Sequence, residues 1–521
     1  MLVNLQKALI NPLVVVGGSL LLVGLLFSDQ AGYLYYLTVA QLVFVPAFVQ
    51  LVVTLTKLDK VLLVIGMVAV TVLLFDPGTT VSLICALLYL VGTLRIAWKG
   101  IDRFLKRGFT NTAELMIDAG LVYLAIGGMW FLAYIAGFDT GFSAITNWLT
   151  AIHFHYSAFL LSISVGLLGR IQMTRLYKIS ALVIATGPMT VAIGITFSHI
   201  IEIISVSLYV AAIYALTYYT FLLKFPSLQA LLVRLPFLTL CITILGSFLY
   251  AYGNVTGTAI VTIPDMLAFH GLLNCFVFGS FTVLGWAMHV PQSKQKPFDF
   301  PVSKVRGKLG EVGAAHPGLV DQLDEYVDVR SLPTSIRDFY ERTEDFQLLA
   351  SVKWATWFKP LAFLYQFVSR RVGQLNLPFS SSQLEMTGEI RLVDESIDGR
   401  IKPRVWKRTI GSETVFVAIY SKHQSNGDTY MNIALPLPLS SMHGILKLSV
   451  LDEKLHLTSK GEGDAGTYLA IGNYVFRLPL HEHFVIEETN GYLTATHDMT
   501  LFGIHFLHID YEMREVYKYA K

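Results

Sequence analysis

The chain has 521 residues, of which 54% are hydrophobic and 15% are charged, and its formal net charge is +2. A soluble protein carries about 25% charged residues, so the composition excludes a wholly soluble protein. A net charge near zero without a long basic block also argues against nucleic acid as a partner.

Charged residues are sparse before residue 290 and frequent after it. We therefore divide the chain into a transmembrane domain (1–289), a linker (290–333), an amphipathic helical segment (334–378) and a cytosolic β-rich domain (379–521). The fold class that follows is an α-helical polytopic membrane bundle joined to a cytosolic α+β domain with an antiparallel β meander or barrel.

The transmembrane domain contains ten apolar runs. A helix needs about 20 apolar residues to cross a bilayer, and most runs approach that length, although the third is short. The runs are residues 12–28, 33–56, 61–75, 79–98, 112–137, 143–169, 176–197, 203–223, 233–253 and 265–288. The sequence therefore predicts a bundle of about ten spans.

The loops between these runs alternate in charge. One set contains Lys57, Lys60, Arg95, Lys99, Arg103, Lys106, Arg107, Arg170, Arg175, Lys178, Lys224 and Arg234; the other contains Asp29, Asp76, Asp139, Glu202 and Asp265, and no Lys or Arg. Cytoplasmic loops retain positive charge. We therefore expect a multi-pass membrane protein with both termini in the cytoplasm.

The sixth run includes "HFHYSAFLLSISVGLLGR", which carries His153 and His155. A histidine in hydrocarbon costs free energy unless it finds a partner, and it therefore suggests a function. Residues two apart on a helix point about 200° away from each other. We expect His153 to face the bundle interior and His155 to face a second neighbour or a water-filled cavity.

Other polar side chains fall in the same outer half of the bilayer. His199 and Glu202 are three residues apart in "FSHIIEII", and His270 and Asn274 are four apart in "DMLAFHGLLNCF". The predicted site for a solute, proton or ion contains His153, His155, His199, Glu202, His270 and Asn274. Imidazole and carboxylate also bind metals, so the candidate ligands of a divalent metal are His153, His199, Glu202 and His270. The alternative is that each histidine is simply hydrogen-bonded within the bundle.

At the cytoplasmic side, "NTAELMIDAG" places Glu114 and Asp118 four residues apart. Asn111 or Thr112 can cap this helix and Glu114 complements its dipole, whereas Asp118 is a further candidate proton or ion site. The preceding stretch 95–109, "RIAWKGIDRFLKRGF", predicts an interfacial helix. The predicted lipid contacts are Trp98, Arg103, Lys106 and Arg107, together with Trp354 and Trp357 in the soluble half.

The soluble half changes its period along the chain. Residues 334–372 are patterned as a helix whose apolar side either packs on the next domain or lies in the lipid headgroups. From residue 379 the period becomes two, with hairpin signals at Asp452-Glu453 and Asn490-Gly491. Such a sheet closes or half-closes into a barrel around a core or an apolar ligand. Candidate zinc ligands on its strands are His481, His483, His505 and His508.

Several stretches resemble a known family. "WLTAIHFHYSAFLLSISVGLLGR", "FSHIIEII" and "AFHGLLNCFVFG" are similar to the membrane part of the YndJ-like proteins of Gram-positive bacteria. "IRDFYERTEDFQLLASVKWATWFKP" and the strands after it are similar to their cytosolic tail, itself resembling a DUF4166-type domain. The resemblance implies a polytopic plasma-membrane protein, sometimes labelled a transporter, and it assigns no residue a role.

Three functions fit these features. The first is a small-solute or ion transporter with an outer-half His/Glu site. The second is a membrane-embedded, metal-dependent enzyme that acts on a lipid or an isoprenoid, and the third is a membrane-anchored β domain that binds lipid. The sequence leaves open the substrate, any enzymatic activity and the oligomeric state.

Overall fold

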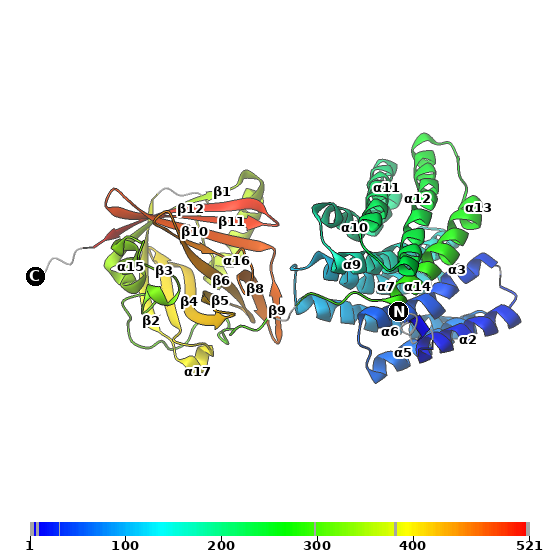
Figure 1. Cartoon of the computed structure of the whole chain (residues 1–521), viewed down its shortest axis with the longest axis horizontal. Coiled ribbons are helices and arrows are strands. Elements are labelled where there is room, and N and C mark those ends of the chain that lie inside the picture. The colour runs from blue at the N-terminus through cyan, green and yellow to red at the C-terminus, as the bar shows by residue number, and fades with distance from the viewer. Residues whose placement is uncertain (1–4, 7–9, 31, 296–297, 380–382, 517–521) are drawn as a thin grey trace, which may run out of the picture. The chain divides into compact units, whose positions relative to one another are not determined.

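A computed structural model describes residues 5–6, 10–30, 32–295, 298–379 and 383–516. The chain forms two compact units, one of Met1–Phe104 with Asn111–Gln295 and the other of Leu105–Thr110 with Lys296–Lys521. Helices make up the first unit, and a β-sheet dominates the second (Figure 1).

Eight helical runs in the described residues are long and apolar enough to cross a membrane. Five are single helices: α6 (Thr79–Leu105), α7 (Thr112–Ala136), α10 (Arg175–Phe197), α11 (His199–Leu222) and α12 (Ser227–Thr256). The first and third predicted runs also form helices, α2 (Pro12–Phe27) and α5 (Lys57–Leu73), which have 16 and 17 residues. The predicted polytopic helical bundle is therefore confirmed; within the described residues it has eight helical runs of spanning length, beside the shorter helices α2 and α5.

The other three runs of spanning length contain π-helical turns. The run Gly32–Val52 consists of η1 (Gly32–Leu34), α3 (Tyr35–Val39), η2 (Ala40–Phe44) and α4 (Val45–Val52). The run Ala144–Ile171 consists of α8 (Ala144–His153), η3 (Phe154–Leu160) and α9 (Leu161–Ile171). The run Ile263–Met288 contains α13 (Ile263–Asp265), η4 (Met266–Gly271), η5 (Asn274–Gly279) and α14 (Ser280–Met288). The segments η2, η3, η4 and η5 are π-helical. π-Helical turns are rare in proteins, and where they occur they often lie at functional sites.

The basic stretch 95–109 does not form a separate interfacial helix. It continues α6 to Leu105, and residues Leu105–Thr110 belong to the second unit. There Arg107 is buried, and its carbonyl accepts a hydrogen bond from the Arg477 backbone at 3.2 Å. Of the lipid contacts predicted in this stretch, Trp98 and Lys106 are exposed, whereas Arg107 is enclosed by protein.

The second unit is built around an antiparallel β-barrel. Its strands are β1 (Phe346–Trp354), β2 (Leu384–Leu392), β3 (Arg404–Ile410), β4 (Glu413–Ser425), β5 (Asp428–Leu437), β6 (Ser440–Leu451), β7 (Lys454–Thr458), β8 (Gly466–Ile471), β9 (Tyr474–Arg477), β10 (Leu480–Thr489), β11 (Tyr492–Leu501) and β12 (Ile504–Glu515). Ten of them follow one another in the order β5-β4-β3-β2-β1-β12-β11-β10-β7-β6, and pairing of β6 with β5 closes the ring. β8 and β9 extend the sheet from β6. The predicted barrel is confirmed.

Both predicted hairpins are present. Asp452 and Glu453 connect β6 to β7 with φ of 50° and 61°, and Asn490 and Gly491 connect β10 to β11 with φ of 52° and 80°. Positive φ at both central residues is the geometry that matches the twist of two-residue hairpins.

The prediction of a continuous helical segment over 334–378 is wrong in its middle. Helices α15 (Thr334–Glu341) and α16 (Lys359–Val372) form, but residues Phe346–Trp354 between them are strand β1. β1 buries alternate residues and pairs with β12 along its whole length. Pairing with a strand about 150 residues later therefore overrides the local helical pattern.

The expected linker 290–333 divides between the two units: residues 290–295 belong to the helical unit, and residues 298–333 belong to the barrel unit. Backbone groups of Lys304, Gly313 and His316 bond to the barrel segments at Asp398, Leu392 and Ile390, at 2.7–3.0 Å. Leu319, Val320 and Leu323 lie in the barrel's hydrophobic core. We call residues 298–333 the strap.

Candidate functional site

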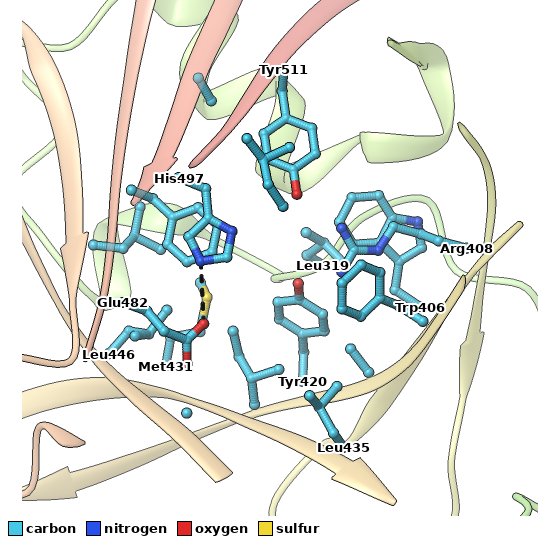
Figure 2. A pocket seen from close by; sticks show the side chains of 18 of the residues that line it. Leu319, Trp406, Arg408, Tyr420, Met431, Leu435, Leu446, Glu482, His497 and Tyr511 are labelled. Carbon is cyan, nitrogen blue, oxygen red and sulfur yellow. Dashed lines mark ion pairs between the residues drawn. The ribbon is translucent and has the colours of Figure 1, made fainter. Parts of the chain in front are cut away.

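The barrel encloses a cavity of about 120 Å³ (Figure 2). A cavity needs roughly 10–15 Å³ by this measure to hold one water, so the space is about ten times larger than that minimum. Its walls are mostly apolar and come from nearly all strands of the ring. Four methionines line it: Met431, Met442, Met499 and Met513. Methionine side chains are flexible and adapt to irregular ligands.

One side of the cavity carries a histidine and a carboxylate. His497 on β11 is only 6% exposed, and its ring is stacked on Phe484 with 3.7 Å between centroids. Within the described residues neither ring nitrogen has a hydrogen-bond partner, and Nε2 lies 3.5 Å from Glu482 Oε2 on β10. A buried polar group without a partner is rare and calls for an explanation. A polar group of a ligand would supply such a partner.

The opposite side carries a guanidinium group between aromatic rings. The Arg408 carbon Cζ lies 4.5 Å from the Trp406 ring centroid and 4.3 Å from that of Phe416. Its Nε has no hydrogen-bond partner among the described residues. Planar guanidinium groups between aromatic faces are suited to binding carboxylates and phosphates.

Two phenol groups complete the polar part of the cavity. The hydroxyls of Tyr420 and Tyr511 point into the space between Arg408 and His497 (Figure 2). Burial raises the pKa of Tyr420 to about 12 and raises that of Tyr511 above its ordinary value. Both groups therefore remain protonated hydrogen-bond donors at neutral pH. The cavity combines apolar walls with a small cluster of donors, which is the usual composition of a small-molecule site.

None of these polar cavity residues was singled out from the sequence. A signal was present in β11, where Leu493, Ala495, His497 and Met499 occupy alternate, buried positions. His497 is the polar member of that apolar series. Arg408 and Glu482 come from distant strands, and only closure of the ring brings them to the same space.

In the membrane unit, the predicted outer-half residues divide into separate groups. Glu202 is buried; Asn254 donates to both of its carboxylate oxygens at 3.0 and 3.2 Å, and His199 Nδ1 lies 3.2 Å from Oε2. A second group contains His270, whose Nδ1 bonds to the carbonyl of Thr243 at 2.9 Å. The Thr243 hydroxyl in turn donates to Asn274 Oδ1 at 3.0 Å.

Of the two histidines of the sixth run, His155 contacts a neighbouring helix, as expected, whereas His153 is exposed. His155 is fully buried, and its Nδ1 donates to the Ala151 carbonyl at 2.8 Å while Nε2 accepts from the Tyr89 hydroxyl at 2.6 Å. His153 is exposed, and its ring centroid lies 6.4 Å from that of His270. The expectation that His153 faces the interior is therefore wrong. The π-helical turn that starts at Phe154 shifts the helical phase, and Gly127 leaves room for the His155 ring.

The predicted metal ligands do not come together. Among the described residues, the one group of three or more His, Cys, Asp or Glu ligand atoms within 4.8 Å of one another is Asp498, His505 and His508 in the barrel unit. His153 and His270 lie near each other, whereas His199 and Glu202 belong to the separate group described above.

At the other end of the bundle, acidic and basic side chains form buried ion pairs. Arg170 binds both oxygens of Glu114, with Nε to Oε1 at 2.7 Å and Nη2 to Oε2 at 2.9 Å. Arg103 bridges Glu114 and Asp118 at 2.6 and 2.7 Å. Asp118, predicted as an ion site, is thus paired with a cation, and Arg103 is engaged by carboxylates instead of lipid. Asn111 caps α7 as predicted.

Comparison with known proteins gives one consistent result. A family model described as "YndJ-like protein" matches residues 35–278. The "Uncharacterized membrane protein YndJ" of Bacillus subtilis (strain 168) is 39% identical over 460 residues, which cover 83% of this chain and 84% of that relative. No solved structure matches. The family model ends at residue 278, so the resemblance of the tail to a DUF4166-type domain stays a prediction.

Proposed function

The chain belongs to the YndJ-like family of membrane proteins, and from this premise we propose that its helices anchor a barrel that binds one lipid-like amphiphile. The observation that carries the proposal is the cavity in the barrel, which joins apolar walls to the His497 ring and to Arg408 Nε, neither of which has a hydrogen-bond partner among the described residues. The apolar chain of a ligand would lie against the methionines. Its anionic or polar head would bind Arg408, His497 and the two tyrosine hydroxyls.

The size of the cavity limits what it holds. A space of about 120 Å³ accepts a small ring or a short alkyl segment, because an apolar cavity of 150 Å³ binds benzene. A longer chain requires the methionine side chains to move. Three rotatable bonds in each of them make such movement inexpensive.

Helix α16 supports contact of this unit with a bilayer. Its apolar side chains are largely exposed; those above 50% are Leu361, Phe363, Leu364, Phe367 and Val368. Lys359, Arg370 and Arg371 at its two ends are exposed as well. An apolar helix surface with flanking cations fits an anionic membrane surface. Trp357 beside it is 46% exposed, in line with the predicted lipid contact, whereas Trp354 stacks on Phe358 inside the unit.

The orientation belongs to the same proposal. The loop charges favour a cytoplasmic location of both termini, and in this proposal the barrel binds its ligand at the inner surface of the plasma membrane. Reporter fusions at the C-terminus test this: a cytoplasm-dependent fluorescent protein should fluoresce, and an active periplasmic phosphatase fusion would contradict the assignment.

Ligand binding is tested with the full chain in lipid nanodiscs and a radiolabelled long-chain fatty acid as probe. Ala418→Phe places a ring in the cavity, and its matched control, Ala314→Phe, places the same ring on the exposed strap. Ala418→Phe should abolish saturable binding and Ala314→Phe should not. Arg408→Met should weaken binding at least tenfold, or about 1.4 kcal/mol, whereas the exposed control Arg391→Met should not. Equal binding by Ala418→Phe and wild type would reject the proposal.

Transport by the membrane unit is a second candidate, favoured by the π-helical segments and by Glu202. This carboxylate is buried and is held by Asn254 and His199 instead of by Arg or Lys in the bonds described above. Ionisable groups buried in a membrane-spanning bundle often belong to proton or ion pathways. In proteoliposomes with an imposed pH gradient, Glu202→Gln and His153→Ala should reduce flux and the exposed control Asp139→Asn should not. Equal flux across the four proteins over a broad solute panel would reject transport by this site.

A further inference from the structure

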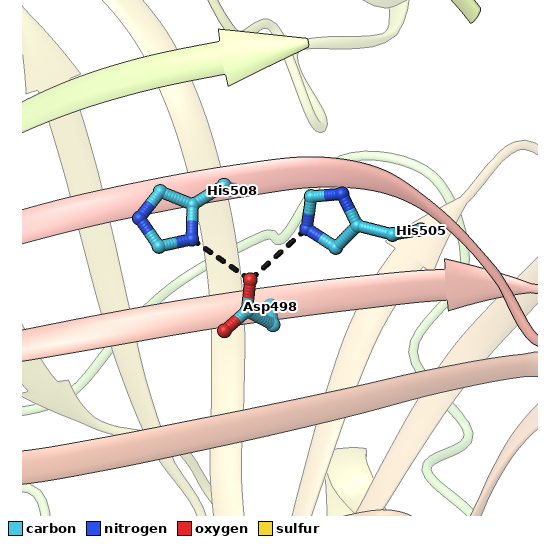
Figure 3. A group of neighbouring side chains, drawn as sticks. All are labelled: Asp498, His505 and His508. Carbon is cyan, nitrogen blue, oxygen red and sulfur yellow. Dashed lines mark hydrogen bonds and ion pairs between the residues drawn. The ribbon is translucent and has the colours of Figure 1, made fainter. Parts of the chain in front are cut away.

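We propose that Asp498, His505 and His508 bind one divalent metal ion, with Zn²⁺ the best fit, on the outside of the barrel. Both imidazole rings face the same carboxylate oxygen (Figure 3). His508 Nδ1 lies 2.8 Å and His505 Nε2 lies 3.0 Å from Asp498 Oδ1. Bond lengths of about 2.0–2.2 Å to zinc imply ligand atoms about 3.4 Å apart in a tetrahedral site, so small side-chain movements complete the geometry.

An irregularity in strand pairing brings the two histidines to one face. His508 is opposite Asp498 and Leu507 is opposite Met499, but His505 is opposite Thr500. One residue of β12 therefore has no opposite residue on β11, which is a β-bulge. In a regular strand, residues three apart point to opposite faces. Here the two residues between the histidines, Phe506 and Leu507, are both buried, whereas His505 is exposed and His508 half-exposed. The bulge therefore turns His505 outward beside His508. Bulges often re-aim a side chain at a functional site.

A second carboxylate orients one of the ligands. His508 Nε2 donates to Asp510 Oδ1 at 2.8 Å, and Lys353 Nζ donates to Asp510 Oδ2 at 2.8 Å. In the structure, Nδ1 also donates a hydrogen bond, to Asp498 Oδ1; with the hydrogen on Nε2 retained, loss of the Nδ1 proton would free the Nδ1 lone pair for a metal. A carboxylate behind a ligating histidine is typical of metal sites and fixes its tautomer.

The ligand set also indicates which ion binds and that a coordination position of the ion stays free. Two imidazoles and one carboxylate suit zinc and other late first-row metals better than calcium or magnesium, which prefer oxygen ligands. Three protein ligands leave at least one position of a tetrahedral ion for water or an exogenous ligand. The side chains are 27–47% exposed, so an ion reaches the site from solvent.

Metal binding is measured on the full chain, purified in detergent with an affinity tag that contains no histidine. Titration calorimetry with Zn²⁺ and elemental analysis after dialysis should give one ion per chain. Asp498→Asn and His505→Gln should weaken zinc binding at least 100-fold, and Asp510→Asn should weaken it about 10–100-fold. The matched control is His483→Gln, which alters a different histidine pair on the sheet, the stacked rings of His456 and His483.

Binding of Co²⁺ gives an independent readout, since a tetrahedral site with imidazole ligands produces strong visible absorption. Wild type and His483→Gln should show it, and Asp498→Asn should not. Absence of stoichiometric zinc in the wild type would overturn the proposal, as would equal zinc binding by wild type and Asp498→Asn. Thermal unfolding of each variant without metal identifies any variant that has failed to fold, and Asp510→Asn then provides the second comparison.

Discussion

Replacement of Arg400 by methionine should destabilise the barrel more than loss of any exposed ion pair. Arg400 and Asp398 have side chains that are 0% exposed, and two hydrogen bonds join them at 2.6 and 3.1 Å. Arg400 also donates to the carbonyls of Asn432 and Ile419, and Ser303 of the strap donates to Asp398 at 2.6 Å. The pair therefore ties the strap to strands β4 and β5.

The size of the effect follows from the charge left behind. Arg400→Met leaves the Asp398 carboxylate buried without a cation, and removal of one partner from a buried pair costs about 3–5 kcal/mol. The exposed pair Lys454–Glu487 serves as control, since breaking a surface pair costs about 0–1 kcal/mol. The double variant Asp398→Leu/Arg400→Met removes both charges and should be more stable than Arg400→Met alone.

Pulse proteolysis of the full chain in urea measures unfolding of the barrel without isolating it. With a slope of about 3 kcal/mol per molar urea, the midpoint for Arg400→Met should fall by roughly 1–1.7 M, and Lys454→Met should leave it nearly unchanged. A shift below about 0.3 M for Arg400→Met would refute the reasoning. So would a double variant less stable than the single one.

Three further predictions concern pH and packing. Burial lowers the pKa of His443 and His423, so the unfolded chain binds more protons than the barrel below about pH 6.5. The free energy of unfolding should therefore fall from pH 7 to 5, by up to about 1.4 kcal/mol per pH unit and group. If pulse proteolysis shows an equally steep fall of stability with pH for His443→Gln and wild type, this prediction is contradicted. Glu114→Gln leaves Arg170 without its carboxylate partner and should lower the temperature at which the detergent-solubilised chain aggregates. Size-exclusion chromatography after heating measures that temperature, and the exposed control Asp139→Asn should not change it. Gly127→Ala would place Cβ 2.8 Å from His155 Nδ1 and should lower the stability of the helical unit by about 1–3 kcal/mol. The control is Gly18→Ala, whose Cβ meets no atom within 4 Å. Equal melting temperatures of the two variants would refute the packing argument.

Features encoded locally were predictable from the sequence. Helices α6, α7 and α10 begin within one residue of their predicted runs because a change from polar to apolar residues marks the start of a span. The hairpin at Asn490-Gly491 was predictable because its residues favour positive φ. Each of these features depends on neighbouring residues alone.

Features that depend on distant residues were not predictable from one sequence. The residues of β1 have a local helical pattern, and the partner that makes them a strand, β12, lies far along the chain. Arg408, Glu482 and His497 become a site only when the barrel closes, and Arg103 meets Glu114 only when α6 packs beside α7. The metal site depends on a bulge in β12, where one residue has no opposite residue on β11. The alternation of polar and apolar residues in the sequence does not reveal such a bulge.

The barrel should hold one amphiphile in its cavity. Native mass spectrometry of the full chain, released from nanodiscs prepared with bacterial lipid extract, tests this claim most directly. Wild type should retain one bound lipid-like molecule at collision energies that strip annular lipid, and Ala418→Phe should lose it under the same conditions. A wild-type spectrum without a retained ligand, or identical retention by Ala418→Phe, would contradict the account.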